Sequence, residues 1–236
     1  MAVTVNSVID RAQITLQDTT GVRWPVTAEL VSWVNDAQRE VSLMKPDASA
    51  VNATITLVAG TKQDIPSAGN RLLKVVRNMS DATGSATGKR AVRLVDREVL
   101  DSQTPNWHDA TLSANTDAAH TTIVKHYVYD EANPRNFYVY PGVDGTSSFL
   151  EIIYSANPSI VSEGGDLSIP DIYANAVLNY VLYMAYMKDA DFAANSQRAQ
   201  THYQLFSSSV LGKGAVDVQT TPNQPTGSMM PTGVPV

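Results

Sequence analysis

The chain has 236 residues, of which 43% are hydrophobic and 17% charged, and its formal net charge is −6. This length is enough for one large or two small domains with a real core. The acidic balance argues against a general nucleic-acid-binding protein, which needs a basic surface, and the absence of cysteine excludes disulfides, cysteine-bound zinc and thiol nucleophiles.

Nothing in the sequence indicates secretion or a membrane span. The N-terminus carries Asn6, Asp10 and Arg11 where a signal peptide needs an apolar run. The uncharged segment 172–187 is shorter than the roughly 20 apolar residues that cross a bilayer, and it contains two asparagines. We therefore expect a water-soluble protein made in a reducing cytoplasm.

Apolar residues recur at helical spacing in two segments near the N-terminus. The first predicted helix begins near Thr4 and ends at Asp18. Thr27 is the expected N-cap of the second helix, which stops at Lys45 because proline follows and cannot continue it. Residues 1–48 are therefore expected to form a helix pair.

Alternation of apolar and polar residues replaces the helical spacing after Pro46, and alternation predicts strands. Residues 141–145 (Pro-Gly-Val-Asp-Gly) are an expected turn, and 96–102 a short helix. We expect residues 49–160 to form an antiparallel β-rich domain. Its predicted strands are 53–57, 64–66, 72–76, 91–95, 122–129, 137–140 and 149–154.

Helical spacing returns at Pro170, a residue favoured in the first turn of a helix. One helix is expected to reach about Lys188, and the next to run from Asp191 to Gly212. Residues 161–211 thus form a second predicted helix pair.

The last segment, residues 212–236, is rich in Gly, Pro, Thr, Gln and Met and has almost no charge. We expect it to be a flexible tail that orders on a partner. The predicted fold is α+β. The N- and C-terminal helix pairs have complementary apolar stripes, so we expect a four-helix bundle with the antiparallel β-rich region inserted.

The segment 172–187 lacks the charged face that a surface helix of a monomer normally carries. A helix that is apolar or aromatic nearly all round needs burial on more than one side, and another subunit often supplies the second. Tyrosine is also enriched at protein interfaces. We therefore predict a subunit interface made by Tyr173, Val177, Leu178, Tyr180, Val181, Leu182, Met184 and Tyr186.

Sequence motifs for catalysis or cofactor binding are missing. Residues 84–90 fail the phosphate-loop pattern, because three residues separate the glycines instead of four and Arg90 follows the lysine. No serine lies in a G-x-S-x-G context. No two histidines have the i, i+4 spacing of a zinc-binding helix, among His108, His120, His126 and His202. We expect no enzyme activity, no metal and no cofactor.

Two blocks of sequence resemble the head-to-tail adaptor (connector) proteins of tailed bacteriophages. The first is residues 24–41, WPVTAELVSWVNDAQREV, followed by Lys45-Pro46-Asp47. The second is residues 169–189, IPDIYANAVLNYVLYMAYMKD, followed by 199–206, AQTHYQLF. These blocks cover the four expected helices, and the β-rich region is similar to the inserted sheet of the tail-tubular adaptors of short-tailed phages.

The resemblance implies a structural role in the virion neck. Such adaptors form a ring, typically dodecameric, below the portal, extend the DNA channel and dock the tail or nozzle. Genomic DNA then passes without sequence-specific binding, which an acidic wall favours by repelling phosphates. In that family the C-terminal segment commonly grips the portal, which here implies portal contacts by Gln219, Pro222, Met229, Met230, Pro231 and Val234.

Two other functions remain open at the level of sequence. One is a stopper or tail-terminator ring of the same particle. The other is a β-rich carbohydrate-binding or hydrolytic tail component. In that case an exposed Trp24, Trp33 or Trp107 would stack on sugars, and Asp96 with Asp101 would act as acid and base.

Overall fold

The computed structural model has an α+β architecture, and its chain divides into two compact units. The helical unit comprises Met1–Ala37, Val161–Leu167 and Asp171–Val236, and the sheet unit comprises Gln38–Ile160 and Ser168–Pro170. The residues that the structure describes are 3–83, 87–109, 120–145, 147–191 and 193–220.

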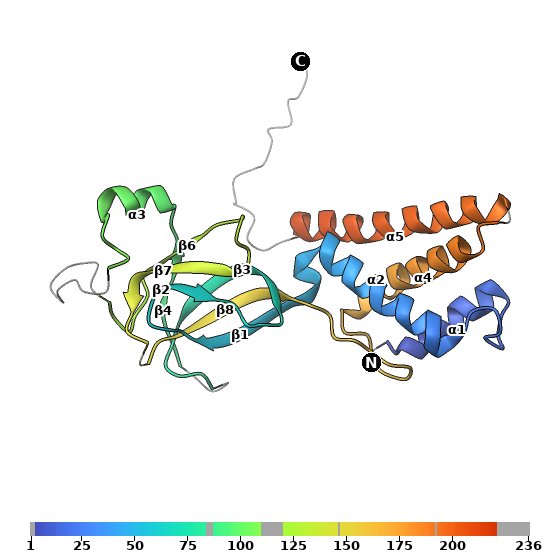
Figure 1. Cartoon of the computed structure of the whole chain (residues 1–236), viewed down its shortest axis with the longest axis horizontal. Helices are drawn as coiled ribbons and strands as arrows, with labels where there is room; N and C mark the ends of the chain where they lie inside the picture. The colour runs from blue at the N-terminus through green and yellow to red at the C-terminus, as the bar shows by residue number, and fades with distance from the viewer. Residues whose placement is uncertain (1–2, 84–86, 110–119, 146, 192, 221–236) are drawn as a thin grey trace, which may run out of the picture. The chain divides into compact units, whose positions relative to one another are not determined.

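Helices from both ends of the chain build the helical unit (Figure 1). In it, α4 (Ala174–Lys188) packs along α5 (Ala193–Thr220) and also against α1 (Val5–Leu16). Helix α1 begins next to Thr4, as expected, and the Thr4 hydroxyl caps it by accepting a hydrogen bond from Ser7 N. The packing of all the helices as a four-helix bundle stays a prediction.

The entry into α2 (Val31–Met44) differs from the expected cap at Thr27. A π-helical turn, η1 (Val26–Leu30), precedes α2, and Pro25 occupies the N-cap position without a side-chain hydrogen bond. The Thr27 hydroxyl instead donates to Glu163 Oε2 at 3.2 Å. The N-cap prediction was wrong because a partner distant in sequence binds this hydroxyl.

Helix α5 continues past Gly212, where we expected it to end, and reaches Thr220. Gly212 and Gly214 lie inside the helix, with open space where a Cβ would stand. Lys213 and Asp217 form an i, i+4 ion pair across this stretch. Glycine lowers helix stability without preventing a helix, so it was a poor marker of the end.

The described residues of the sheet unit form two four-stranded sheets. The first has the order β1-β8-β3-β4 and the second the order β2-β7-β6-β5; neighbouring strands are antiparallel except β5 and β6, which are parallel. The strand bounds are β1 (Ala50–Thr56), β2 (Gly60–Asp64), β3 (Gly69–Met79), β4 (Gly88–Ala91), β5 (Arg93–Leu94), β6 (His126–Tyr129), β7 (Asn136–Val143) and β8 (Phe149–Ala156).

One core lies between these two sheets. Leu150 and Ile152 of β8 are fully buried in the same cluster as Phe137 and Val139 of β7. In β8 and at the start of β7 alternate residues point into the cluster, as the period of two in the sequence predicts, whereas Leu72 and Val75 of β3 are three residues apart across a register shift. The short 3-10 helix η2 (Pro46–Ser49) leads from α2 into β1.

Strand β7 is longer than the sequence predicts. We expected it to end at Tyr140 and a turn to follow at 141–145, but the strand continues through a cis Tyr140–Pro141 peptide bond to Val143. Val143 pairs with Gly60 of β2 and forms a bridge with Thr121. Partners on both sides thus keep Pro141 and Gly142 extended.

Buried amides on α2 hold the chain where it returns from the sheets. In the helical unit, Asn35 exchanges two hydrogen bonds with the backbone of Val161, at 2.8 and 3.0 Å. In the sheet unit, Gln38 Oε1 accepts hydrogen bonds from Ser168 N and Oγ, at 2.7 and 3.1 Å.

None of the helices in the described part of the chain has the length and apolarity that crossing a membrane requires.

Candidate interaction surfaces

The carboxylates proposed for sugar chemistry have structural partners. Asp96 caps α3 (Arg97–Gln103) by accepting a hydrogen bond from Glu98 N. Asp101 accepts hydrogen bonds from Trp107 Nε1 at 2.8 Å and Arg97 Nε at 3.3 Å. The Trp107 hydrogen bond lowers the pKa of Asp101, whereas a general acid at neutral pH needs a raised pKa.

The tryptophans are also poorly placed to stack on sugars. Trp107 is fully buried and Trp24 is 6% exposed, so the expected exposure of these two was wrong; Trp33 is half-buried. Trp107 packs with Leu100, Val128 and Tyr140 under α3. Among the described residues, no group of three or more histidines and carboxylates has the arrangement of a metal site.

Helix α4 carries the predicted subunit interface, and the structure divides that set in two. Tyr173, Val177, Val181 and Leu182 are buried, with at most 5% exposure. A single chain already covers these side chains, so a second subunit is not needed to bury them. Leu178, Tyr180, Met184 and Tyr186 remain half-buried and keep surface for a partner.

An aromatic seam joins α4 and α5. Tyr180 lies 5.2 Å from Phe206 and 5.7 Å from Tyr183, and Tyr183 lies 5.1 Å from Tyr203, measured between ring centroids. Phe206 is fully buried, whereas Tyr203 is 43% exposed. The seam therefore holds the two helices together from inside and presents aromatic edges outside.

His202 closes one end of this seam. Its ring stacks on Tyr186 at 5.6 Å, and its Nδ1 lies 3.0 Å from Asn179 Oδ1. The guanidinium of Arg198 lies 5.9 Å from the Tyr186 ring centroid. Burial lowers the pKa of His202, which favours the neutral imidazole.

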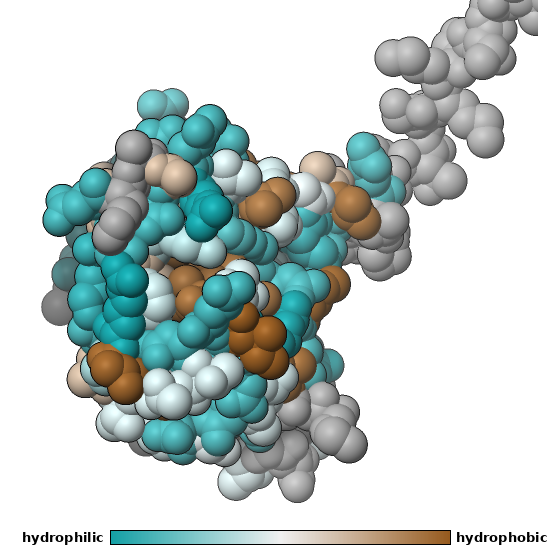
Figure 2. Space-filling view, turned by 90° about the vertical axis from the view of Figure 1, so that its right-hand side faces the viewer, coloured by the Kyte–Doolittle hydropathy of each residue, from teal (hydrophilic) through white to brown (hydrophobic). Residues whose placement is uncertain are grey.

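Helix α5 adds apolar side chains that the sequence pattern did not single out. Leu205 is 47% exposed, Leu211 58% and Val216 52%. Figure 2 shows the molecule from the side where α4 turns into α5, and apolar side chains there alternate with polar ones. The helical spacing of Ala199, Tyr203 and Phe206 was visible in the sequence, but the exposure of Leu205 could not be read from it.

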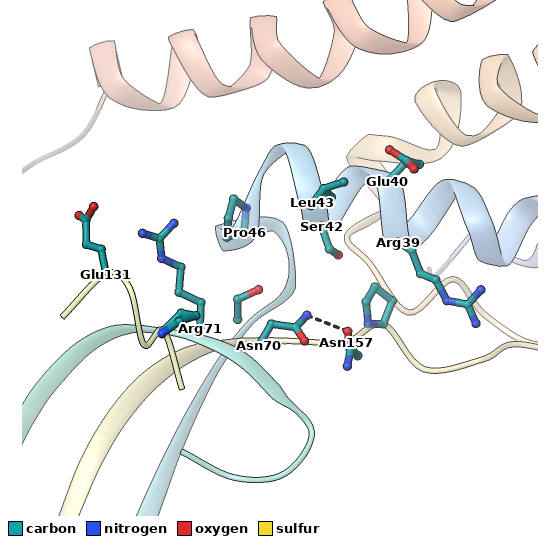
Figure 3. Close-up of a pocket in the computed structure, with 12 residues that line it drawn as sticks. Arg39, Glu40, Ser42, Leu43, Pro46, Asn70, Arg71, Glu131 and Asn157 are labelled. Carbon is teal, nitrogen blue, oxygen red and sulfur yellow. Dashed lines mark hydrogen bonds between the residues drawn. The ribbon is translucent and has the colours of Figure 1, made fainter. Parts of the chain in front are cut away.

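A groove of about 590 Å³ crosses the sheet unit between the end of α2 and the edge of the first sheet. Leu43 and three prolines supply apolar walls, and Asn70 Nδ2 donates to Asn157 Oδ1 at 2.7 Å across its floor. Arg71 and Glu131 lie at one end (Figure 3). The two serines that line the groove, Ser42 and Ser155, bond to Gln38 O and Ser49 Oγ, so neither is paired with a base.

The predicted portal-contact residues fall almost entirely outside the described residues. Gln219 lies exposed in the last turn of α5. The other five, Pro222, Met229, Met230, Pro231 and Val234, are not described by the structure.

Comparison with known proteins gives one match that spans nearly the whole chain. The family model described as SU10 adaptor protein matches residues 3–226. It thus covers both helical segments and the sheets between them. No curated protein matches the chain.

Proposed function

We propose, since this chain belongs to the SU10 adaptor protein family of phage head-to-tail adaptors, that its copies form a ring below the portal. A protein of this family is a structural component of the phage neck. The family match over residues 3–226 is the observation that carries the proposal. In the proposed ring, which we expect to be dodecameric, the channel continues that of the portal and the tail or nozzle docks below.

Half-buried and exposed apolar side chains of α4 and α5 support contact between copies. Leu178, Met184 and Tyr186 on α4, with Tyr203 and Leu205 on α5, are the apolar side chains that we assign to it. They lie on or beside the aromatic seam that already joins the two helices, so association needs no rearrangement of the helices. Aromatic and methionine side chains are enriched at such interfaces.

The C-terminal segment supplies the proposed portal contact. Because α5 is helical to Thr220, we place the beginning of this portal-binding tail after that residue. Gln219, in the last turn of α5, stays among the proposed portal-contact residues. The remaining residues carry no charge and four prolines, a composition that folds poorly without a partner.

Genomic DNA is the remaining proposed partner, passing through the channel without sequence-specific binding.

A stopper or tail-terminator ring is the second candidate function. The family match favours the adaptor, because its description names that role.

Truncation after Thr220 tests the tail. We expect the shortened chain to unfold at the same temperature as the full chain, because it keeps every described helix and strand, and to bind the portal of the same phage more weakly. Native mass spectrometry of each form with the portal measures the number of bound copies. Equal binding by both forms would remove the tail from the portal contact.

A further inference from the structure

Acidic charge is concentrated in one of the two units. The helical unit has ten acidic and five basic residues, whereas the sheet unit has thirteen acidic and twelve basic residues. The chain's net charge of −6 thus lies mainly on the helical unit. The nearly balanced sheet unit can therefore present a local surface of positive charge.

Three cations of the sheet unit form such a surface, which we call the basic surface: Arg90, Arg93 and Lys125. Arg93 N donates to Lys125 O at 3.3 Å, beside the parallel pairing of β5 and β6. The buried amide of Asn78 donates to the carbonyl oxygens of Arg90 and Val124, at 2.8 Å each. Backbone hydrogen bonds therefore hold the three cations on neighbouring segments.

The charges of the basic surface are not balanced within the described part of the sheet unit. Burial, followed by the charges of Arg90, Arg93 and Lys125, lowers the pKa of the adjacent His126, and no acid opposes them there. None of the three cations forms an ion pair with another described residue. The residues outside the described ranges contain a single acid, Asp117.

Neighbouring cations have acids beside them. Arg77 pairs with Glu151 at 2.6 Å, and Arg97 pairs with Asp101 at 3.3 Å. Hydrogen bonds from Thr83 lower the pKa of Asp81, and the charge of Lys89 adds to this effect. Other cations of the sheet unit, such as Lys62 and Lys74, also form no ion pair with a described residue, but in the basic surface three such cations lie on neighbouring segments. Arg90 and Arg93 are exposed and Lys125 is half-exposed.

The helical unit carries a matching set of three exposed acids, Glu163, Asp166 and Asp171, which we call the acidic loop. Asp171 Oδ1 accepts a hydrogen bond from Val3 N at 3.0 Å, and Asp166 forms a β-bridge with Thr4.

Glu163 accepts the Thr27 hydroxyl, and the adjacent Gly164 N donates to Asn6 Oδ1 at 3.0 Å. The acidic loop is thus fixed in place by uncharged donors. None of its three carboxylates forms an ion pair with another described residue.

We propose that the basic surface of one copy binds the acidic loop of the next copy. The inference rests on the proposed ring and specifies how neighbours in it recognise each other. The two surfaces are different and lie on different units, so the contact is heterologous, the type that generates rings when the rotation closes. Complementary charge steers the encounter and fixes its orientation, while the apolar face of the helical unit adds affinity.

Two charge-reversed full-length variants test the contact. The first, R90E/R93E, makes the basic surface negative; the second, E163K/D166K, makes the acidic loop positive. We expect each variant alone to self-associate at least tenfold more weakly than the wild type in sedimentation velocity, with and without the portal of the same phage. We expect an equimolar mixture to regain assembly, because every alternating neighbour then presents opposite charges.

Matched controls separate this contact from general charge effects. Lys62→Glu in the sheet unit and Asp10→Lys in the helical unit reverse exposed charges elsewhere, and both should assemble like the wild type. The neutral variant R90Q/R93Q should show an intermediate loss. Thermal unfolding of every variant confirms that it is folded.

Three outcomes would overturn the inference while leaving the adaptor function intact. In the first, either charge-reversed variant assembles like the wild type. In the second, the mixture of the two variants does not regain assembly. In the third, R90E/R93E assembles normally but no longer binds a labelled 30-bp DNA duplex. Recovery in the mixture without any ring on the portal would support the inference and contradict the proposed function. A wild-type chain that never self-associates, alone or on the portal, contradicts both.

Discussion

Asn78 connects three segments of the sheet unit through one buried side chain. Its amide donates to the carbonyls of Arg90 and Val124, and its Oδ1 accepts from Val124 N, all at 2.8 Å. We expect Asn78→Ala to lower the free energy of unfolding by about 3 kcal/mol, because buried backbone groups lose their partners. Urea denaturation measures the loss.

Asn70→Ala is the matched control for this prediction. Asn70 is an exposed asparagine of the same strand, β3, and its amide donates only to the exposed Asn157. We expect a loss below about 0.5 kcal/mol for the control. Similar losses for the two variants would show that the Asn78 network adds no stability.

His202 makes the stability of the helical unit depend on pH. Burial lowers its folded-state pKa below the ordinary value of 6.5, so the unfolded chain binds the proton more readily. The stabilisation is present above pH 6.5 and is lost as the pH falls through the lowered pKa.

We expect His202→Gln to flatten the decrease in unfolding temperature between pH 7 and pH 5. Part of the slope will remain, because burial also lowers the pKa of His108 and His126. Calorimetry at several pH values measures the slope. A variant whose slope equals that of the wild type would show that His202 does not contribute.

Sequence reasoning at the residue scale succeeded where the partner is local. Helix starts near Thr4 and at Asp96 were predicted, and both residues cap their helices by accepting hydrogen bonds from backbone amides within three residues. Asn78 and Asn35 bind backbone groups 46 and 126 residues away, and nothing in their neighbourhood indicated this. Only the fold brings those groups together.

At the scale of elements, the glycines inside α5 give a direct test of its length. Gly212 and Gly214 have no neighbouring atom within 4 Å of the point where a Cβ would stand, so alanine fits without collision. We expect Gly212→Ala to stabilise the helix by about 1 kcal/mol, because alanine is the better helix former. Circular dichroism should show more helix and a higher unfolding temperature.

Gly145→Ala is the opposite control. Gly145 has a φ of 79°, and an added Cβ would lie 2.8 Å from Ala59 N. We therefore expect this substitution to destabilise the sheet unit. A destabilising Gly212→Ala would indicate that the last turns of α5 are not helical in solution.

Helix α4 shows why an unusually apolar helix is an uncertain sign of an interface. Val181 is fully buried in the single chain, so we expect Val181→Asp to unfold the helical unit rather than only block assembly. Leu205→Asp, at a side chain that is 47% exposed, should remain folded and weaken association between copies. Circular dichroism and sedimentation velocity separate the two effects.

A Leu205→Asp variant that assembles normally would remove α5 from the proposed interface.

The existence and order of the helices and most strands followed from the period of the hydrophobic residues, because this period reflects burial on one face. The ends of α5 and β7 did not, because glycine lowers helix stability without ending a helix, and because Val143 pairs with Gly60 of a strand distant in sequence. The division of α4 residues into buried and half-buried required the packing of α1 and α5.

At the scale of the whole molecule, the chain combines a helical unit drawn from both termini with an inserted pair of sheets. The spacing of apolar residues predicted the order of helices, strands and helices. The resemblance of the two helical blocks of sequence predicted the adaptor family. The uneven distribution of charge between the units was not, because it depends on which distant segments join each unit.

The central claim is that copies of this chain assemble on the portal. The most direct test is negative-stain imaging of the chain mixed with the portal of the same phage. The account predicts a ring stacked on the narrow end of the portal, from which the copies can be counted. Portals that remain bare at saturating concentration of the folded chain would contradict the adaptor function.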